Sequence, residues 1–508
     1  MRTLNSAKNL ASSLGISITM TLLGFLTRKV FVDNVGVEYL GLNGLLQNIL
    51  GVVTLLEGGF GTSVVYNLYK PLAERNEEKI IALLQLYRNV YRYIALGVII
   101  FALCLYPFID LFIKDAEGLS YVSIVYFIFL FNSIIQYFTA YKWSLINADQ
   151  KNYKLIAINL TYQIGLNLAK LLILYYTKNY ILYLLVEAIF GLGLNYAIVQ
   201  KVNKLYPFIL TKKKYKVDDA IKKNIITNVK ALFFHSLGGY FMHSTSNIVI
   251  SSFVGIAIVG LYSNYTLLTG LVTTFSNQIL NSFSESVGNL VAVEKSDRAY
   301  EVFRTVFFLN FLVISVISIL LYNIVSPFIV WWLGEEYLLS TVTLSLIVLN
   351  FYINNMRSSI QTFKVKSGIF IQDRFSPLLQ GVINLCLSLL LVQYWGINGV
   401  LFAFGFSILC IGFWQYPRLV YKYTFHRPLW NYFKWYLFYT LCALLALGIS
   451  NLWIHCIILN NKLFQAMING FISLFVVIII YTLAFIRHTP FMSLFAYVKL
   501  VISNIRQK

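Results

Sequence analysis

Apolar segments of roughly 20 residues recur along the whole chain, separated by short polar connections. A helix of this length spans the hydrocarbon core of a bilayer, which is about 30 Å thick. About fourteen such segments are present, at residues 10–32, 41–66, 89–113, 119–141, 154–176, 180–200, 232–254, 260–283, 305–331, 340–363, 377–394, 398–420, 435–456 and 465–486. Because a spanning segment must satisfy its own backbone hydrogen bonds, each is expected to be helical. The pattern predicts an all-α polytopic membrane protein.

One of these segments carries a row of polar and basic residues. The row consists of Asn350, Asn354, Arg357, Gln361 and Lys364, at spacings of four, three, four and three residues. These intervals place all five side chains on one face of one helix. A charge near the middle of a membrane helix costs about 3 kcal/mol on insertion scales, so it normally faces protein or water. We therefore expect this helix to line a wet, cationic cavity.

The composition agrees with a membrane protein. Hydrophobic residues make up 58% of the chain and charged residues only 12%, and the mean hydropathy is +0.72, far from the average of soluble domains. The net charge of +20 does not require a nucleic-acid partner. Most Lys and Arg residues lie in the tails and the even-numbered connections, as expected for cytoplasmic loops. Both termini are therefore expected in the cytoplasm.

Short matches between distant segments indicate an internal duplication. Gly36, four residues and Gly41-Leu42 recur as Gly255, four residues and Gly260-Leu261, at an offset of 219. Two further matches follow in the same order at nearly the same offset, and each relates one span to the span six later. The chain is therefore predicted to contain two six-helix repeats with the same orientation, plus two C-terminal helices.

These repeats give the expected domain bounds. The N-terminal six-helix half covers 1–200, and the C-terminal half covers 232–425. A lysine-rich cytoplasmic connector joins them over 201–231, where its charge favours a topogenic loop in contact with anionic lipid. Residues 426–508 supply the two extra helices and a cytoplasmic tail.

Basic side chains at depth point to an anionic ligand. Arg28, Lys170 and Arg357 are expected near the outer end of the first span, the outer side of the fifth and the cytoplasmic side of the tenth. Arg presents a fork of donors to phosphate oxygens, and Lys a mobile point charge. Gln163 and Asn167 share a face with Lys170. These residues are candidate binding groups, although Arg28 could instead snorkel to the interface and polar residues also pack membrane helices together.

Three further residues are candidate proton or cation coupling sites. Glu57 in the second span and Glu187 in the sixth are the clearest acidic residues at depth, and His243 in the seventh span could titrate near neutral pH. A buried pair with a basic neighbour is the alternative for Glu57, and a hydrogen-bonded packing role is the alternative for His243. No metal, nucleophile or phosphate-loop motif is visible, so neither an enzyme nor a cofactor is expected.

The first 90 residues carry a resemblance to a known family. The matching residues are Gly36, Gly41-Leu42, Glu57-Gly58-Gly59-Phe60-Gly61, Tyr66 and Tyr69-Lys70-Pro71-Leu72-Ala73-Glu74. They resemble the bacterial polysaccharide flippases, or Wzx-type oligosaccharide flippases, of the multidrug/oligosaccharidyl-lipid/polysaccharide exporter superfamily. The remaining chain agrees in span count and repeat layout.

The resemblance implies a function and partners. It implies movement of an undecaprenyl-diphosphate-linked oligosaccharide across the bacterial cytoplasmic membrane for O-antigen, capsule or exopolysaccharide synthesis, with membrane lipid and glycan polymerase machinery as further partners. The basic side chains would hold the diphosphate, and the Asn and Gln side chains the sugars. Arg28 and Glu57 also resemble positions of peptidoglycan-precursor flippases, but Val52-Val53-Thr54 stands where those proteins carry arginines, so a complete lipid II site is not transferred.

Two other functions stay open from the residues alone. A cation-coupled multidrug exporter of the same superfamily is favoured by Glu57 and Glu187 if the cavity is anionic, whereas the basic residues speak against cationic cargo. A membrane glycan polymerase would usually carry a large external loop, and no external connection here exceeds roughly ten residues.

Overall fold

The computed structural model describes residues 21, 23–51, 55, 57, 60–114, 119–149, 151–293, 296–369 and 372–492. This part of the chain is nearly all helical and contains no strand, which confirms the expected all-α membrane fold. Contacts divide the chain into two units, Met1–Gly260 and Leu261–Lys508. Each unit is described by itself, and the domain bounds expected above stay a prediction.

The first unit follows the expected apolar segments closely. Residues 23–35 are helical. The elements that follow are α2 (Val37–Leu50), α4 (Phe60–Ala73), α5 (Glu77–Leu105), α6 (Val122–Ile135), α7 (Ala140–Ala148), α8 (Ile156–Thr177), α9 (Tyr180–Leu205), α10 (Asp219–His243) and α11 (Thr245–Phe253). Helix α12 (Ile256–Val293) begins in this unit and continues in the second.

The second unit contains the other helices. They are α13 (Ser296–Trp332), α14 (Thr341–Met356), α15 (Ser358–Lys366), α16 (Ser376–Trp395), α17 (Ile397–Cys410), α18 (Gly412–Val420), α19 (Trp430–His455) and α20 (Lys462–Phe485). Asparagine or serine in the loops begins several helices in both units by accepting a backbone N–H of the first turn, at Asn76, Asn179, Ser340 and Asn461.

The number of membrane spans was expected to be about fourteen. Within the described residues, nine helices are long and apolar enough to cross a membrane, or ten if the bent pair around α6 and α7 forms one span. Several expected spans are broken into two shorter helices, as at α10–α11 and α14–α15. The count of nine or ten covers single described helices only, and the figure of fourteen stays a prediction.

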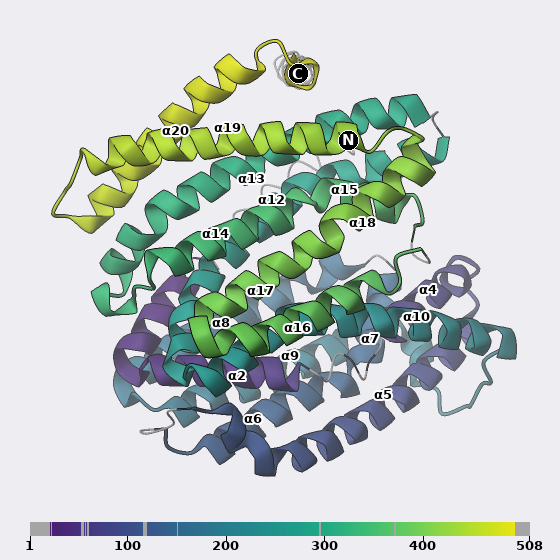
Figure 1. Cartoon of the computed structure of the whole chain (residues 1–508). Helices are drawn as coiled ribbons and strands as arrows, with labels where there is room; N and C mark the ends of the chain where they lie inside the picture. The colour runs from purple at the N-terminus through teal and green to yellow at the C-terminus, as the bar shows by residue number, and fades with distance from the viewer. Residues whose placement is uncertain are drawn as a thin grey trace, which may run out of the picture. The chain divides into compact units, whose positions relative to one another are not determined.

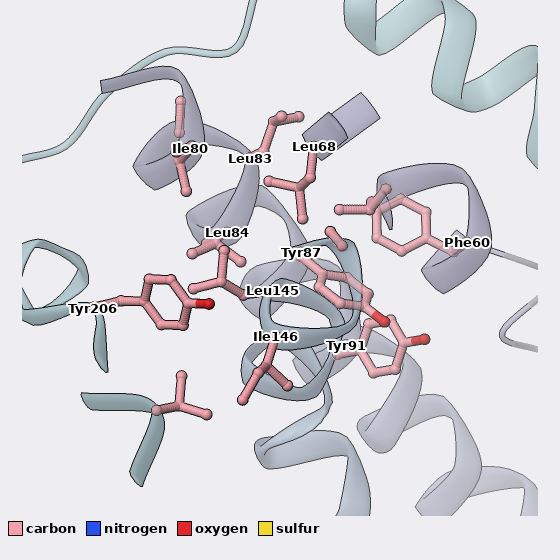
Figure 2. Close-up of a cluster of buried hydrophobic side chains, with 14 of the residues drawn as sticks. Phe60, Leu68, Ile80, Leu83, Leu84, Tyr87, Tyr91, Leu145, Ile146 and Tyr206 are labelled. Carbon is pink, nitrogen blue, oxygen red and sulfur yellow. The ribbon is translucent and has the colours of Figure 1, made fainter. Parts of the chain in front are cut away.

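A buried core holds the first unit together near the ends of α4, α5 and α7. Its members include Phe60 and Leu68 of α4, Tyr87 of α5 and Leu145 of α7 (Figure 2). Burying one such side chain contributes about 1.5–3 kcal/mol relative to leaving it in water. Outside this core, large apolar side chains such as Leu96 face outward, as lipid-facing residues do.

The two C-terminal helices are fastened to α13 by buried polar groups. Both lie along α13 (Figure 1). The amide of Asn323 in α13 donates to Ser450 Oγ of α19 at 3.0 Å and to Ser473 Oγ of α20 at 2.9 Å. Asn469 of α20 donates back to the Asn323 carbonyl at 2.8 Å. Such bonds between membrane helices contribute about 0.6–2 kcal/mol each, so α19 and α20 are an integral part of the second unit.

The glycines of the proposed duplication occupy equivalent positions, and the two copies of the motif lie in close backbone contact. Gly36 and Gly255 both have positive φ, +104° and +143°, and directly precede α2 and α12. A β-carbon on Gly41 would lie 2.0 Å from the Ile256 carbonyl oxygen, and one on Gly260 would lie 2.1 Å from the Val37 carbonyl oxygen. Positions 37 and 41 correspond to 256 and 260 at the offset of 219. The repeated motif is thus a reciprocal close contact between two backbones.

This contact predicts a large effect of a single methyl group. Gly41→Ala is expected to destabilise the protein by about 3 kcal/mol, because the obstructing atom belongs to a backbone that cannot rotate away. The matched control is Gly97→Ala in α5, where a β-carbon meets no atom within 4 Å and the helix gains about 0.5–1 kcal/mol. Thermal unfolding of the purified variants measures both, and equal midpoints would contradict the contact.

Candidate functional site

Two helix breaks meet at Arg357 in the second unit. The span expected over 340–363 is interrupted at Arg357, between α14 and α15, and a second break at Ile411 separates α17 from α18. A β-carbon at Gly412, the first residue of α18, would lie only 2.0 Å from Arg357 Nη1. The guanidinium therefore lies directly against the α18 backbone. Broken membrane helices are tolerated where their freed backbone groups find partners inside the protein or a cavity.

The break in α14 has such a partner. The Asn310 amide of α13 is fully buried and donates to the carbonyl oxygens of Asn355 and Met356, at 3.2 and 3.0 Å. These carbonyls belong to the last turn of α14, where the helix leaves its acceptors unused. Asn310 thus stabilises the end of α14 and leaves Arg357 at the negative end of its dipole.

The Arg357 guanidinium is buried without an acidic partner. The residue is 5% exposed, and its Nη2 donates to Asn354 Oδ1 at 2.7 Å. Its Nε and Nη1 have no hydrogen-bond partner, and no carboxylate forms an ion pair with it in the part of the chain that the structure describes. Because a buried charge normally requires several strong partners, Arg357 is a buried cation whose charge the described residues leave uncompensated.

Tyrosines surround this guanidinium. Its main electrostatic neighbours are the hydroxyls of Tyr416, Tyr432 and Tyr436, and its Cζ lies 5.6 Å from the centre of the Tyr416 ring. The hydroxyls of Tyr432 and Tyr436, both on α19, are buried and have no partner. Arg357 and α19 therefore bring several unused donors to one place, an arrangement suited to an anion.

The other members of the polar row pack against neighbouring helices of the same unit. Asn350 donates to the Leu401 carbonyl at 2.8 Å, and Gly405 leaves room for its amide. Gln361 hydrogen-bonds Tyr416. Lys364 forms a buried ion pair with Asp373. The charge of Lys364 is thus compensated, whereas that of Arg357 is not.

In the first unit, two of the predicted basic residues face one tyrosine. Lys170 of α8 donates to Glu187 Oε2 of α9 at 2.7 Å, and its Nζ lies 4.4 Å from the centre of the Tyr183 ring. Arg28 has the same Tyr183 as an electrostatic neighbour. The Lys170 side chain is 11% exposed and that of Glu187 41%. The structure therefore joins a predicted binding residue and a predicted coupling residue in one ion pair.

A cavity of about 550 Å³ opens beside this ion pair. Its lining is polar and aromatic, with Glu57 and Glu187 as its ionisable acidic residues and no Lys or Arg among the lining residues described. The neutral polar lining residues are Asn132, Ser133, Gln136, Thr139, Ser144, Asn195, Tyr87, Tyr91, Tyr137 and Tyr162. The pocket of the first unit is thus acidic rather than cationic.

Glu57 is held by tyrosines rather than by a basic neighbour. Tyr91 donates to Glu57 Oε1, and Ser144 donates to the hydroxyl of Tyr87, next to Tyr91, at 3.0 Å. The hydroxyls of Tyr87 and Tyr91 point in the same direction in Figure 2. A β-carbon at Gly61 would lie 2.7–2.9 Å from these hydroxyls and the carboxylate. Gly61 therefore makes room for a hydrogen-bonded acid.

The remaining predicted residues have separate positions. Asn167 contacts Thr27 at 3.5 Å and donates to the carbonyl of Gln163 one turn earlier. The Gln163 side chain is exposed. His243 is the exposed last residue of α10, before the break to α11. Whether Arg28, Lys170 and Arg357 form one ladder stays a prediction.

Sequence reasoning missed the groups that complete both sites. The neighbours of Arg357 are Tyr416, Tyr432 and Tyr436, which lie far from it along the chain. The sequence contains 36 tyrosines without a distinguishing spacing. The partner of Lys364 is Asp373, which lies in a loop. Gly412 was the available signal, because a glycine in the middle of an apolar segment suggests close approach of another group.

The Lys170–Glu187 pair predicts an asymmetric response to mutation. Glu187→Gln leaves a buried ammonium unpaired and is expected to cost about 3 kcal/mol, whereas Lys170→Met leaves a half-exposed carboxylate and should cost less. The double variant Lys170→Met/Glu187→Gln removes both charges and should be close to wild type. Thermal unfolding of the three purified variants tests this order, and additive losses would contradict a coupled pair.

Comparisons with known proteins agree on the fold. No protein-family model and no curated protein matches the sequence. Among solved structures, the inward closed conformation of the lipid II flippase MurJ has a TM-score of 0.65 at 15% identity, covering 92% of this chain and 98% of that one. An inward-facing multidrug resistance MATE transporter of the MOP superfamily has a TM-score of 0.59 at 11% identity, with coverage of 78% and 96%.

A third structure extends the same relation. A mutant of the MATE transporter VcmN from Vibrio cholerae has a TM-score of 0.51 at 14% identity, with coverage of 84% of this chain and 100% of that one. The chain therefore has the fold of transporters of the multidrug/oligosaccharidyl-lipid/polysaccharide exporter superfamily and is a multi-pass membrane protein. The superfamily fold expected from the resemblance is confirmed.

Proposed function

We propose that this protein is a flippase that moves an undecaprenyl-diphosphate-linked oligosaccharide across the bacterial cytoplasmic membrane, with both termini in the cytoplasm. The observation that carries the proposal is Arg357, a buried guanidinium at the meeting point of two helix breaks, to which no described residue offers a carboxylate. Burial of an unpaired charge costs several kcal/mol. We therefore infer that this guanidinium has a functional role in binding an anion.

A diphosphate fits the donors around Arg357. The unused Nε and Nη1 atoms provide adjacent donors for phosphate oxygens, and the Tyr432 and Tyr436 hydroxyls can donate to the same group. Lys364 is less suited because Asp373 already neutralises it. Asn350, Asn354 and Gln361, together with Gln163 and Asn167 of the first unit, would hydrogen-bond sugar hydroxyls.

The acidic residues of the first unit have a separate proposed role. Glu57 and Glu187 line the cavity, and each accepts a hydrogen bond, Glu57 from Tyr91 and Glu187 from Lys170. We assign coupling to a proton or cation to these residues and to His243. Arg28 and Lys170 lie beside Tyr183 near that cavity. Arg28 would attract the anionic cargo, and Lys170, whose charge Glu187 offsets, would contribute less.

One observation favours a second function. The cavity of the first unit contains two acidic residues and no basic one among its described lining residues, which suits a cationic drug better than a diphosphate. A cation-coupled multidrug exporter is therefore the second candidate, and the fold is shared by MATE transporters.

Depletion of the protein in cells separates the two functions. Spheroplasts are probed with a membrane-impermeant glycan-binding protein, and intact cells with a fluorescent cationic dye. A flippase predicts that lipid-linked oligosaccharide disappears from the outer face and accumulates inside while dye levels are unchanged. Higher dye retention with normal outer-face oligosaccharide favours the exporter. Outer-face oligosaccharide that is no longer lengthened would indicate a polymerase-type role, and disruption of assembly machinery would give the same result.

A further inference from the structure

A second cavity lies between the two C-terminal helices, away from Arg357. Its volume is about 540 Å³, and its lining comes from the first three turns of α19 and from the segment that ends α20. Lys434, Trp435 and Leu441 contribute from α19, and Arg487 and His488 follow α20 directly. The loop-charge pattern places this end of both helices at the cytoplasmic interface.

The mouth of this cavity is positively charged. Lys434 and Arg487 are exposed and form no ion pair or hydrogen bond within the described residues. The Arg304 guanidinium lies over the Trp435 ring at 6.0 Å. Burial, followed by the Arg304 charge, lowers the pKa of His488 to about 4, so His488 is neutral at pH 7. Its two ring nitrogens are buried and have no hydrogen-bond partner.

One wall of the cavity is apolar. Leu437, Phe438 and Leu441 follow Lys434 by three, four and seven residues and therefore share one face of α19. Their side chains are 61%, 41% and 55% exposed. Ala484 on α20 is small and leaves the groove open. Trp435 beside them is typical of a membrane interface. A ligand of this groove has an anionic end and a hydrocarbon end.

We propose that the groove binds an anionic phospholipid. The phosphate lies between Lys434 and Arg487, and one acyl chain lies along Leu437, Phe438 and Leu441. Cytoplasmic-leaflet lipids of this charge are attracted by about 1 kcal/mol per basic residue at the surface. The lipid fills the space between α19 and α20 and is a structural ligand, distinct from the transported molecule.

Native mass spectrometry of the protein in equimolar phosphatidylglycerol and phosphatidylcholine tests the proposal. Wild type should retain phosphatidylglycerol at least tenfold over phosphatidylcholine. Lys434→Gln/Arg487→Gln should lose this preference. The matched control, Lys201→Gln/Lys204→Gln, removes two exposed lysines at the end of α9 and should keep it.

Three further results would overturn the proposal. Equal phosphatidylglycerol retention by both double variants would show that the groove is not the site. Protection of Lys434 from amine labelling by glycerol phosphate as strongly as by the lipid would show a free phosphate site. Displacement of phosphatidylglycerol by undecaprenyl diphosphate would assign the groove to cargo. Because the readout is lipid retention, a negative result leaves the flippase proposal untouched, and failure of flipping leaves this one untouched.

Discussion

Arg357→Met is expected to make the protein more stable while strongly reducing transport. Methionine has a similar length and fills the same space without a charge. Replacing buried charges by apolar groups of similar volume is commonly neutral or stabilising by about 1–4 kcal/mol, and among the described residues no carboxylate paired with Arg357 would be left behind. Loss of its contacts to a diphosphate should cost about 1.5–3 kcal/mol, or about 10- to 100-fold in transport. Thermal unfolding and surface glycan together measure this prediction.

The exposed Arg418 of α18 provides the control. Arg418→Met should leave both the unfolding midpoint and the surface glycan near wild type. If Arg357→Met instead lowers the midpoint and glycan falls in proportion to the amount of folded protein, Arg357 is a structural residue, and the phosphate-binding proposal loses its main support.

Gly412→Ala is expected to act through Arg357. The new methyl carbon would lie 2.0 Å from Nη1 and 2.9 Å from Gln380 Oε1, so the guanidinium must leave its position. Overpacking of this kind costs about 1–3 kcal/mol, and the displaced Arg357 should no longer support transport. In an Arg357→Ala background the 2.0 Å contact is removed and only the Gln380 amide stays close, so the cost of the methyl group should fall by more than about 1 kcal/mol.

A double-mutant cycle of Gly412→Ala and Arg357→Ala measures this coupling by thermal unfolding. The non-additive part should exceed about 1 kcal/mol. Gly448→Ala in α19, where a β-carbon meets no atom within 4 Å, should show additive effects with Arg357→Ala. Additivity at Gly412 as well would mean that the close approach to α18 does not exist in the folded protein.

The helices could be predicted from the sequence because apolar length alone decides whether a segment can enter a membrane. The repeated glycines were also informative. Gly36 and Gly255 share positive φ, and Gly41 and Gly260 share a backbone contact. In both cases the position requires glycine, because a β-carbon would be strained at positive φ or would clash with the facing backbone.

Whether each charged side chain forms an ion pair could not be predicted in the same way. Arg357 and Lys364 belong to one polar row, yet Lys364 is paired with Asp373 and Arg357 has no acidic partner within the described residues. Lys170 and Glu187 had different expected roles, yet they form one ion pair. Periodicity places a side chain on a helix face, but the partner comes from another helix, and helix packing within a membrane leaves little trace in local sequence.

The broken helices were likewise hidden. Hydropathy treats 340–363 and 398–420 as uninterrupted spans, whereas the structure breaks them at Arg357 and Ile411. At the break beside Arg357, the freed carbonyls accept hydrogen bonds from Asn310 of α13. A hydropathy profile does not identify Asn310 as their partner. A feature of the secondary structure is thus stabilised by a tertiary hydrogen bond.

The most direct test of the proposed function is the leaflet distribution of lipid-linked oligosaccharide in depleted cells that carry wild type, Arg357→Met or Arg418→Met. All three proteins are expressed at matched levels, and outer-face oligosaccharide is measured on spheroplasts with an impermeant glycan probe. We expect normal outer-face oligosaccharide with wild type and Arg418→Met and accumulation at the cytoplasmic face with Arg357→Met. Normal outer-face oligosaccharide in cells that lack the protein altogether would contradict a flippase.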